Sequence, residues 1–129
     1  MKILHLDSSI NHEFSVTRQL SAEIVRQLVA TGQEHQLTYR DLVKDEISHL
    51  TGEIASGFRP VSGRPIATAL LASEQQVSDA LVSEFLESEV IVLGAPMYNF
   101  SVSSQLKARM DRIAQPGKNF SYTPTGPVG

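Results

Sequence analysis

The chain has 129 residues, of which 41% are hydrophobic and 19% are charged, a composition typical of one globular domain. The formal net charge is −3 and no run of Lys or Arg occurs, so binding to nucleic acid or to an anionic membrane is not expected. The absence of cysteine excludes disulfides and thiolate metal sites, and no export signal is recognisable at Met1. We therefore expect a cytoplasmic protein.

The first predicted element is a short apolar strand over Lys2 to Leu6, in which His5 is expected to be a packed or hydrogen-bonded core residue. A loop rich in hydroxyl groups follows. A helix is then predicted from the N-cap residue Ser15 to Gly32, because apolar residues recur from Leu20 onwards at the spacing of one helical face. The order of strand, polar loop and helix start brings hydroxyl groups to the beginning of a helix.

The start of this helix predicts a site for a phosphate group. Unpaired backbone N–H groups lie there beside the hydroxyls of Ser15 and Thr17, at the positive end of the helix macrodipole. A helix cap at Ser15 and a turn at Ser8 and Ser9 explain the same residues without any ligand. Arg18 in the first turn suits either a nearby anion or simple exposure to water. This stretch alone leaves both interpretations open.

A second and more exposed strand is predicted over His35 to Arg40, where Leu37 and Tyr39 alternate with polar residues. Its exposure suits an edge of the sheet. From Asp41 to Pro65 no period is sustained, so we expect a loop with at most a short helix near Gly52 to Ser56. A connection of this length often serves a site or an interface.

The longest helical pattern covers Ile66 to Leu86 and leads to the apolar run Val90 to Leu93. Because this run has no polar alternation, we expect a strand covered on both faces. Gly94 to Pro96 end it. Four residues then stand where open parallel sheets bind ligands, namely Met97, Tyr98, Asn99 and Phe100. A loop whose aromatic side chains cap the core is the alternative.

Strands and helices alternate along the chain, which predicts an α/β fold with a doubly wound parallel sheet of strand order 2-1-3. The loops after the first and third strands then converge, so residues 9–17 and 97–100 can touch one ligand. Three strands are few for this fold, and the third would remain an edge. We therefore expect an incomplete domain or an edge that a second chain covers.

Near the end of the chain, apolar residues at Leu106 and Ile113 predict a short helix that ends at Pro116. The tail that follows suggests a hairpin or a lid that carries Phe120 and Tyr122.

Several other chemistries lack their motifs. No GxGxxG, GxxxxGK[ST] or GxSxG pattern occurs, and His12 and His49 lack the spacing of metal ligands, so we expect no metal site. A phosphate-bearing ligand with a planar head remains, and flavin mononucleotide (FMN) fits this description. Its phosphate is expected at the helix start, and its ring beside Tyr98 or Phe100.

The segments SSINHEFSVTRQL and APMYNFSVSSQLKARMDRIAQPGKNFSYTPTGPVG resemble the FMN-dependent NADH azoreductases, also described as NADH:quinone oxidoreductases, which have a flavodoxin-like fold. The resemblance covers essentially the whole chain. It rests on the APMYNF segment, the QLK tripeptide and Asp-Arg pair that follow it, and the F-x-Y-T-x-x-GP tail. It implies that the FMN phosphate is bound by Ser9, Ser15, Val16 and Thr17. It also implies that the isoalloxazine ring is held by Met97, Tyr98, Asn99 and Phe100.

The resemblance further implies an enzyme with one FMN per subunit. In it NADH reduces the flavin and leaves, and a quinone or azo compound then takes the electrons. No side chain is implied as a catalytic acid or base. Family members are homodimers with the cleft at the subunit junction, to which residues 41–65, Phe120 and Tyr122 are candidates to contribute.

Family members continue past the GP motif, so residues 1–129 resemble roughly the N-terminal two-thirds of their domain. We accordingly expect residues 1–129 to form an incomplete flavodoxin-like FMN-binding domain that retains flavin weakly. Two alternatives remain open. One is a non-enzymatic electron carrier that uses the same phosphate loop, and the other is an inactive fragment of the enzyme.

Overall fold

The computed structural model describes residues 1–59, 62–63 and 69–129. The chain divides into two compact units. Unit 1 comprises Met1–Ile47 and Glu87–Lys107, and unit 2 comprises Ser48–Leu86 and Ala108–Gly129. Both segments that the sequence predicts to bind ligand belong to unit 1.

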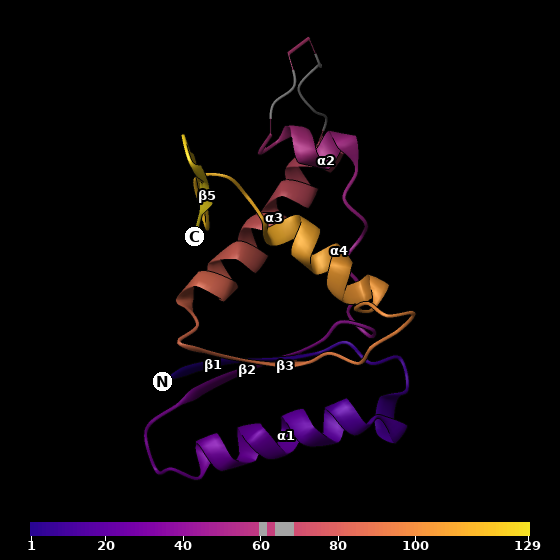
Figure 1. Cartoon of the computed structure of the whole chain (residues 1–129), viewed down its shortest axis with the longest axis vertical. Helices are drawn as coiled ribbons and strands as arrows, with labels where there is room; N and C mark the ends of the chain where they lie inside the picture. Colours follow the sequence, from indigo (N-terminus) through magenta and orange to yellow (C-terminus); the bar gives the residue numbers. More distant parts are fainter. Residues whose placement is uncertain (60–61, 64–68) are drawn as a thin grey trace. The chain divides into compact units, whose positions relative to one another are not determined.

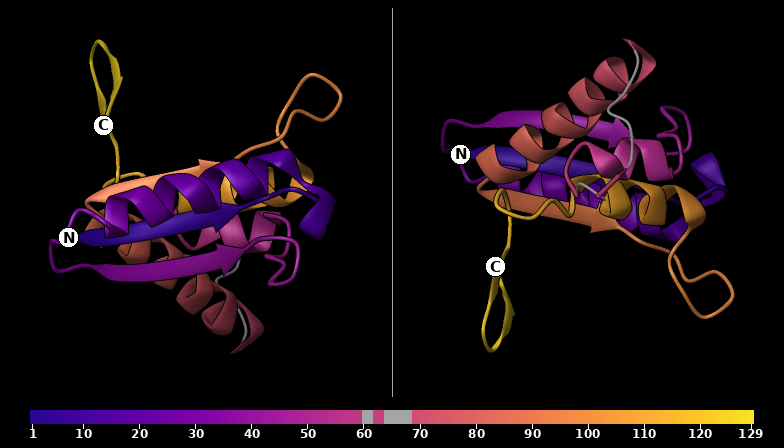
Figure 2. Two further views of the ribbon diagram at one scale, coloured as in Figure 1. Left: turned by 90° about the horizontal axis from the view of Figure 1, so that it is seen from below. Right: turned by 90° about the horizontal axis from the view of Figure 1, so that it is seen from above.

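Unit 1 is built on a parallel sheet of three strands, β1 (Lys2–Asp7), β2 (Gln36–Asp41) and β3 (Val90–Gly94). The sheet is seen edge-on in Figure 1, and Figure 2 shows the strand order β2-β1-β3, which confirms the predicted order 2-1-3. β1 and β2 each run one residue past their predicted ends. The register pairs Asp7 with both Asp41 and Gly94, so the three strands end level with one another.

Helix α1 (Val16–Val29) covers one face of this sheet (Figures 1 and 2). Its inner side buries Val25 against Ile3 of β1 and Val92 of β3. The helix ends three residues before the predicted Gly32. Gly32 has a φ of +77°, a left-handed conformation that glycine adopts without strain because it has no Cβ. The chain therefore turns at Gly32 towards β2.

The predicted burial of β3 on both faces is wrong for two of its residues. Val92 is 8% exposed, whereas Ile91 is 39% and Leu93 is 44% exposed. Successive side chains of a strand point to opposite faces, and α1 packs only against the face that bears Val92. The exposed character predicted for β2 is confirmed, because none of its residues is buried and β2 lies at an edge of the sheet.

Unit 2 contains helix α2 (Gly52–Ser56), most of α3 (Ala69–Glu87) and the last part of α4 (Ser104–Ile113). The short helix predicted at residues 52–56 is confirmed. The predicted helix from Ile66 is confirmed from Ala69 onwards, and its first three positions, like Pro65, lie outside the described residues.

The interior of unit 2 is organised around Arg112, whose side chain is fully buried. Its guanidinium donates hydrogen bonds to Ser78 Oγ at 2.8 Å, to Ser48 Oγ at 2.9 Å and to Glu74 Oε2 at 2.9 Å. A buried charge is tolerated only when it is paired and hydrogen-bonded in this way. The arginine of the Asp-Arg pair noted in the sequence therefore has a structural role.

The predicted C-terminal hairpin is confirmed. β4 (Ser121–Thr123) and β5 (Gly126–Val128) pair antiparallel, and the rings of Phe120 and Tyr122 meet edge to face with centroids 5.3 Å apart. Tyr122 is 67% exposed, so this aromatic pair lies at the surface of unit 2.

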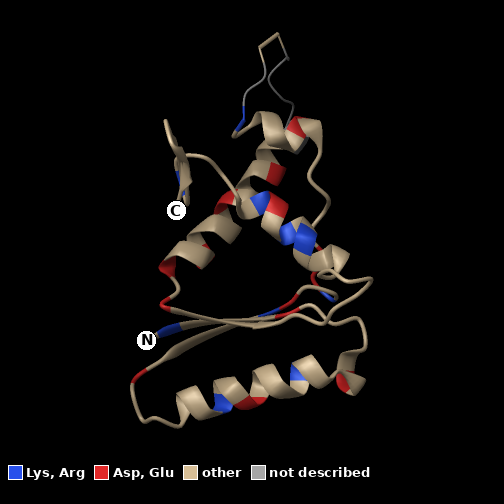
Figure 3. Ribbon diagram, viewed as in Figure 1, with Lys and Arg blue, Asp and Glu red and all other residues tan. Residues whose placement is uncertain are grey.

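Charges of both signs are interspersed along α1, where Glu23 lies between Arg18 and Arg26 (Figure 3). The helix therefore presents no basic stripe. Among the described residues, no helix is both long enough and apolar enough to cross a bilayer. Within the same residues, no cluster of His, Asp and Glu has an arrangement suited to a metal ion.

Candidate functional site

The loops that follow β1 and β3 meet, as the sequence predicted. We call residues 8–15 loop L1 and residues 95–103 loop L3. The backbone N–H of Ser8 and its hydroxyl both donate to the carbonyl oxygen of Gly94, at 3.2 and 2.9 Å. Further out, the N–H of Ile10 donates to the hydroxyl of Tyr98 at 3.1 Å. The two loops are thus joined by hydrogen bonds where they leave their strands, at Ser8 and Gly94, and again between Ile10 and Tyr98.

The start of α1 has the geometry of an anion site. Ser15 is extended and caps the helix, and its Oγ accepts the N–H of Arg18 at 3.2 Å and lies 3.1 Å from the hydroxyl of Thr17. The N–H groups of Val16 and Thr17 belong to the first turn, where no helical carbonyl lies within reach. Two backbone donors and two hydroxyls therefore gather at the positive end of the helix.

Ser9 is buried within L1. Its side chain accepts the N–H of Asn11 at 3.2 Å and lies 3.3 Å from the hydroxyl of Tyr98. The residue is 1% exposed, so its hydroxyl shapes the loop from inside. The hydroxyl of Tyr98 is likewise engaged with L1, which the sequence did not indicate.

L3 contains a strained turn. Tyr98 and Ser101 exchange two backbone hydrogen bonds of 2.8 and 2.9 Å, and between them Asn99 and Phe100 have φ angles of +50° and +64°. This is the pattern of a type I′ turn, in which Asn-Gly is the favoured pair. Phe100 occupies the position of the glycine, at a cost of about 1–2 kcal/mol.

L3 exposes two of its apolar side chains to solvent instead of burying them. Phe100 is 97% exposed and Met97 is 72% exposed. A backbone outlier that presents an aromatic ring to solvent, at the carboxyl end of a parallel strand, is characteristic of a ligand-binding loop. The sequence had identified these residues, but the left-handed backbone of Asn99 and Phe100 was not foreseen.

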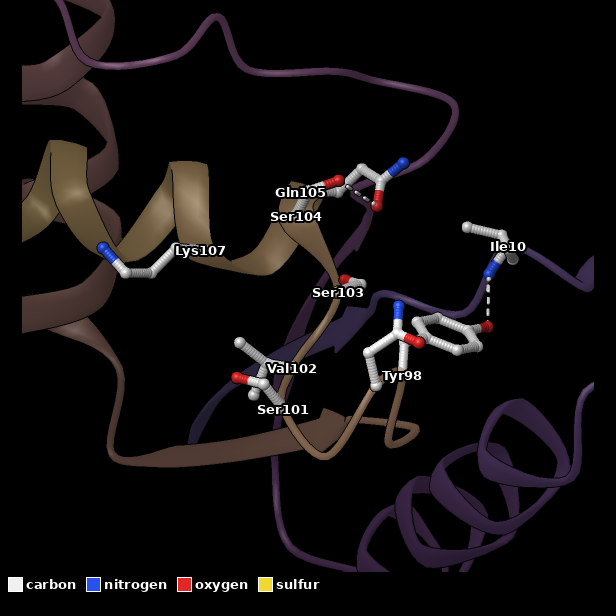
Figure 4. A pocket seen from close by; sticks show the side chains of 9 residues that line it. Ile10, Tyr98, Ser101, Val102, Ser103, Ser104, Gln105 and Lys107 are labelled. Carbon is white, nitrogen blue, oxygen red and sulfur yellow. Dashed lines mark hydrogen bonds between the residues drawn. The ribbon is translucent and has the colours of Figure 1, made fainter.

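A cavity of about 680 Å³ lies between L1, L3 and the start of α4 (Figure 4). Its volume lies within the range of ordinary cofactor pockets. Apolar groups and hydroxyls mix in its wall, which is formed by Ile10, Tyr98, Asn99, Ser101, Val102, Ser103, Ser104, Gln105 and Lys107. Figure 4 shows the ring of Tyr98 with its hydroxyl directed at the backbone of Ile10.

Arg18 has an anionic partner in the protein itself. Its guanidinium binds Asp41 through two hydrogen bonds of 2.7 and 2.8 Å and also donates to the carbonyl oxygen of Ser9 at 2.8 Å. The hydrogen bond with Arg18 lowers the pKa of Asp41 to about 2. The guanidinium is therefore committed to the protein, and its charge is already balanced.

A chain of hydrogen-bonded polar groups, of which His5, Asp7 and Ser21 are buried, continues from this pair. Asp7 accepts hydrogen bonds from Ser21 Oγ at 2.7 Å and from the hydroxyl of Tyr39 at 3.1 Å. Ser21 Oγ lies 2.9 Å from Nε2 of His5, which confirms the expected hydrogen-bonded core role of that histidine. Burial of the Tyr39 hydroxyl, with a contribution from the charge of Asp7, raises its pKa to about 12.

The sequence reasoning missed this network. Asp7 and Asp41 each close a strand, and the carboxyl ends of parallel strands meet at one edge of the sheet. Two acidic residues at such ends were a signal for a charged centre, and Arg18 was its obvious cation. Because the two strands were predicted to end one residue earlier, the acidic residues were read as part of the loops.

The chain is similar in sequence to known proteins over its whole length. A family model described as "Flavodoxin-like fold" matches residues 1–129. The chain is 54% identical over 129 residues to the FMN-dependent NADH:quinone oxidoreductase 2 of Xanthomonas euvesicatoria pv. vesicatoria and covers 59% of it. It is 52% identical over 129 residues to the FMN-dependent NADH:quinone oxidoreductase of Ralstonia nicotianae, of which it covers 62%.

Among solved structures, the azoreductase from Bacillus anthracis matches the whole chain with a TM-score of 0.86 and 27% sequence identity, and 62% of that protein is covered. The chain thus spans about three-fifths of the length of the relatives it matches.

Proposed function

The chain belongs to the flavodoxin-like fold family. We propose that it functions as an FMN-dependent oxidoreductase that passes electrons from NADH to a quinone or an azo compound. The observation that carries the proposal is the junction of L1 and L3 through Tyr98. It brings the start of α1, which we propose to bind the phosphate, and a turn with exposed apolar side chains into one unit. A phosphate and a planar ring are the two ends of FMN.

The residues present fit this cofactor. Ser15, Val16 and Thr17 would hold the phosphate through hydroxyls and backbone N–H groups, with Ser9 shaping the loop beside it. The ring would be held by L3, through Met97, Tyr98, Asn99 and Phe100. Neutral donors at a helix start suit a phosphate even though Arg18 is occupied by Asp41.

Bound FMN supplies the electron-transfer chemistry, and the chain's own residues bind it, orient it and limit its access to water. Exposed apolar groups such as Phe100 and Met97 offer flat contact surface to a ring. We propose no side chain as a catalytic acid or base. One FMN per subunit, in a homodimer whose junction includes residues 41–65, Phe120 and Tyr122, forms part of the same proposal.

The proposal includes an order of events. NADH and the quinone or azo acceptor would occupy the same cleft in turn, with the donor leaving before the acceptor enters. Initial-rate measurements over both substrates test this order, because parallel double-reciprocal lines are expected. Intersecting lines would contradict it.

The substitution Val16→Pro tests the phosphate site. Val16 is the first helical residue and Ser15 before it is extended, so proline fits there and removes only one backbone N–H. Loss of one hydrogen bond to a charged group is expected to weaken FMN binding about tenfold or more, measured by quenching of flavin fluorescence. Gly52→Pro, at the first residue of α2, is the matched control and should leave FMN binding unchanged.

NADH oxidation tests the reaction. We expect the chain, supplied with FMN in the absence of oxygen, to oxidise NADH over many turnovers only when a quinone or an azo dye is also present. Reduction of bound flavin by dithionite but not by NADH would favour the electron carrier instead. A chain that leaves flavin fluorescence unquenched at every FMN concentration would refute the proposal.

A further inference from the structure

We propose that Arg18 and Tyr98 are positioning residues that grip the Ser9–Ile10 peptide from its two ends and so hold L1 in the shape that receives a phosphate. The inference deepens the proposed binding of FMN and rests on it. Neither side chain need touch the phosphate. Both act through the backbone of L1.

The geometry of one peptide group carries the inference. In a trans peptide the C=O and the N–H point in opposite directions. The carbonyl oxygen of Ser9 accepts from Arg18 Nη2 at 2.8 Å and Nε at 3.2 Å, while the N–H of Ile10 donates to the Tyr98 hydroxyl at 3.1 Å. The same peptide is therefore held by α1 on one side and by L3 on the other, and it cannot rotate without breaking three hydrogen bonds.

Arg18 is itself immobilised. Asp41 receives two of its N–H groups, and its Nη1 also lies 3.2 Å from the hydroxyl of Tyr39. Asp41 Oδ1 in turn accepts the N–H of Val43 at 3.0 Å, which fixes the carboxylate at the end of β2. The Arg18 side chain is 13% exposed. A planar guanidinium can serve Asp41 and Ser9 together, whereas a lysine ammonium has no fork with which to do so.

Tyr98 is anchored at its other end. It is the first residue of the strained turn, closed by backbone hydrogen bonds with Ser101. Its hydroxyl accepts a hydrogen bond from the N–H of Ile10 and also lies 3.3 Å from the hydroxyl of Ser9. A loop held in its binding conformation before the ligand arrives loses less conformational entropy on binding. Holding L1 in this way therefore strengthens the binding of a flavin that bears a phosphate, because its phosphate contacts L1.

The charged side of the grip is tested by comparing FMN with riboflavin, which has the same ring and no phosphate. Arg18→Lys and Arg18→Met are expected to weaken FMN binding about tenfold and to leave riboflavin binding nearly unchanged, as measured by quenching of flavin fluorescence. Arg26→Lys and Arg26→Met are matched controls, because Arg26 lies on the same helix in an exposed pair with Glu23. They should preserve the ratio of the two affinities.

Equal weakening of FMN and riboflavin binding, or no weakening of either, would overturn the inference. Urea unfolding of each variant separates this effect from a loss of folded protein. If Arg18→Met is too unstable to measure, Arg18→Lys retains the charge and decides the question.

Hydrogen exchange provides an arm that needs no flavin. The amide proton of Ile10 is expected to exchange faster in Arg18→Lys and in Tyr98→Phe than in the unaltered protein and in Arg26→Lys. An unchanged exchange rate in both variants would show that the peptide is not gripped, whether or not FMN binds. Faster exchange in a protein that binds no FMN would refute the proposed function and the phosphate role of L1, while the grip itself would stand.

Discussion

The hydroxyl of Ser8 donates a hydrogen bond to the carbonyl oxygen of Gly94 at 2.9 Å, although the two residues lie 86 positions apart in the sequence. The backbone N–H of Ser8 reaches the same oxygen at 3.2 Å. Ser8 is fully buried, so both bonds are shielded from water. This contact holds the ends of β1 and β3 together and is the base on which L1 and L3 meet.

Gly94 leaves no room for a side chain. A Cβ at this position would overlap Oδ1 of the buried Asp7 and would lie 3.3 Å from Ser21 Oγ and from the carbonyl oxygen of Thr17. Gly94→Ala is therefore expected to lower the free energy of unfolding by about 1–3 kcal/mol, as measured by urea denaturation. Gly129→Ala, which meets nothing within 4 Å, should have no effect. Equal stability of the two variants would contradict the close approach of α1 to β3.

The pair of Arg18 and Asp41 makes stability depend on acid pH. Because the pKa of Asp41 is about 2 in the folded protein and 3.8 ordinarily, its contribution is present above pH 4 and lost as pH falls to 2. The difference in unfolding free energy between the unaltered protein and Asp41→Asn is expected to be on the order of 1 kcal/mol at pH 5 after allowance for solvent screening. Chemical denaturation at several pH values tests this, and a difference independent of pH would contradict it.

The hydroxyl of Tyr39 is expected to ionise at a higher pH than an ordinary tyrosine. Its pKa is raised to about 12 by burial and by the charge of Asp7, so its contribution to stability is present below pH 10 and is lost between pH 10 and 12. The chain has three tyrosines, and their ionisation is measured by ultraviolet absorbance. Tyr39→Phe should remove a transition near pH 12. Its persistence in that variant would assign it to another residue.

The left-handed backbone at Phe100 lowers the stability of the protein and exposes the ring to solvent. Phe100→Gly is expected to raise the free energy of unfolding by up to about 1 kcal/mol, because glycine adopts a φ of +64° without strain and little packing is lost. The same change should weaken FMN binding. Phe14→Gly, which removes a ring that is also largely exposed (83%) but has no positive φ, should give no gain in thermal or urea stability.

A loss of stability in Phe100→Gly would show that the turn is not strained. A gain in stability without any loss of FMN affinity would instead remove Phe100 from the proposed ring site.

The sequence by itself determined the order of the strands and the meeting of the two loops. Apolar residues in β1 and β3 and the helical period of α1 are local patterns, and the right-handed crossover rule converts them into the order β2-β1-β3. The N-cap role of Ser15 followed from residue type as well. The roles of the individual residues towards FMN remain predictions.

Only the tertiary structure decided which groups pair across the sheet. The partners of Arg18 depend on Asp41 lying level with Asp7, and that register comes from backbone pairing between strands and not from any local pattern. The left-handed turn at Phe100 violates the preference of its own residue type and is imposed by the two hydrogen bonds that close it. Periodicity records which side chains avoid water, whereas a site depends on directions and distances that exist only once separate segments have packed together.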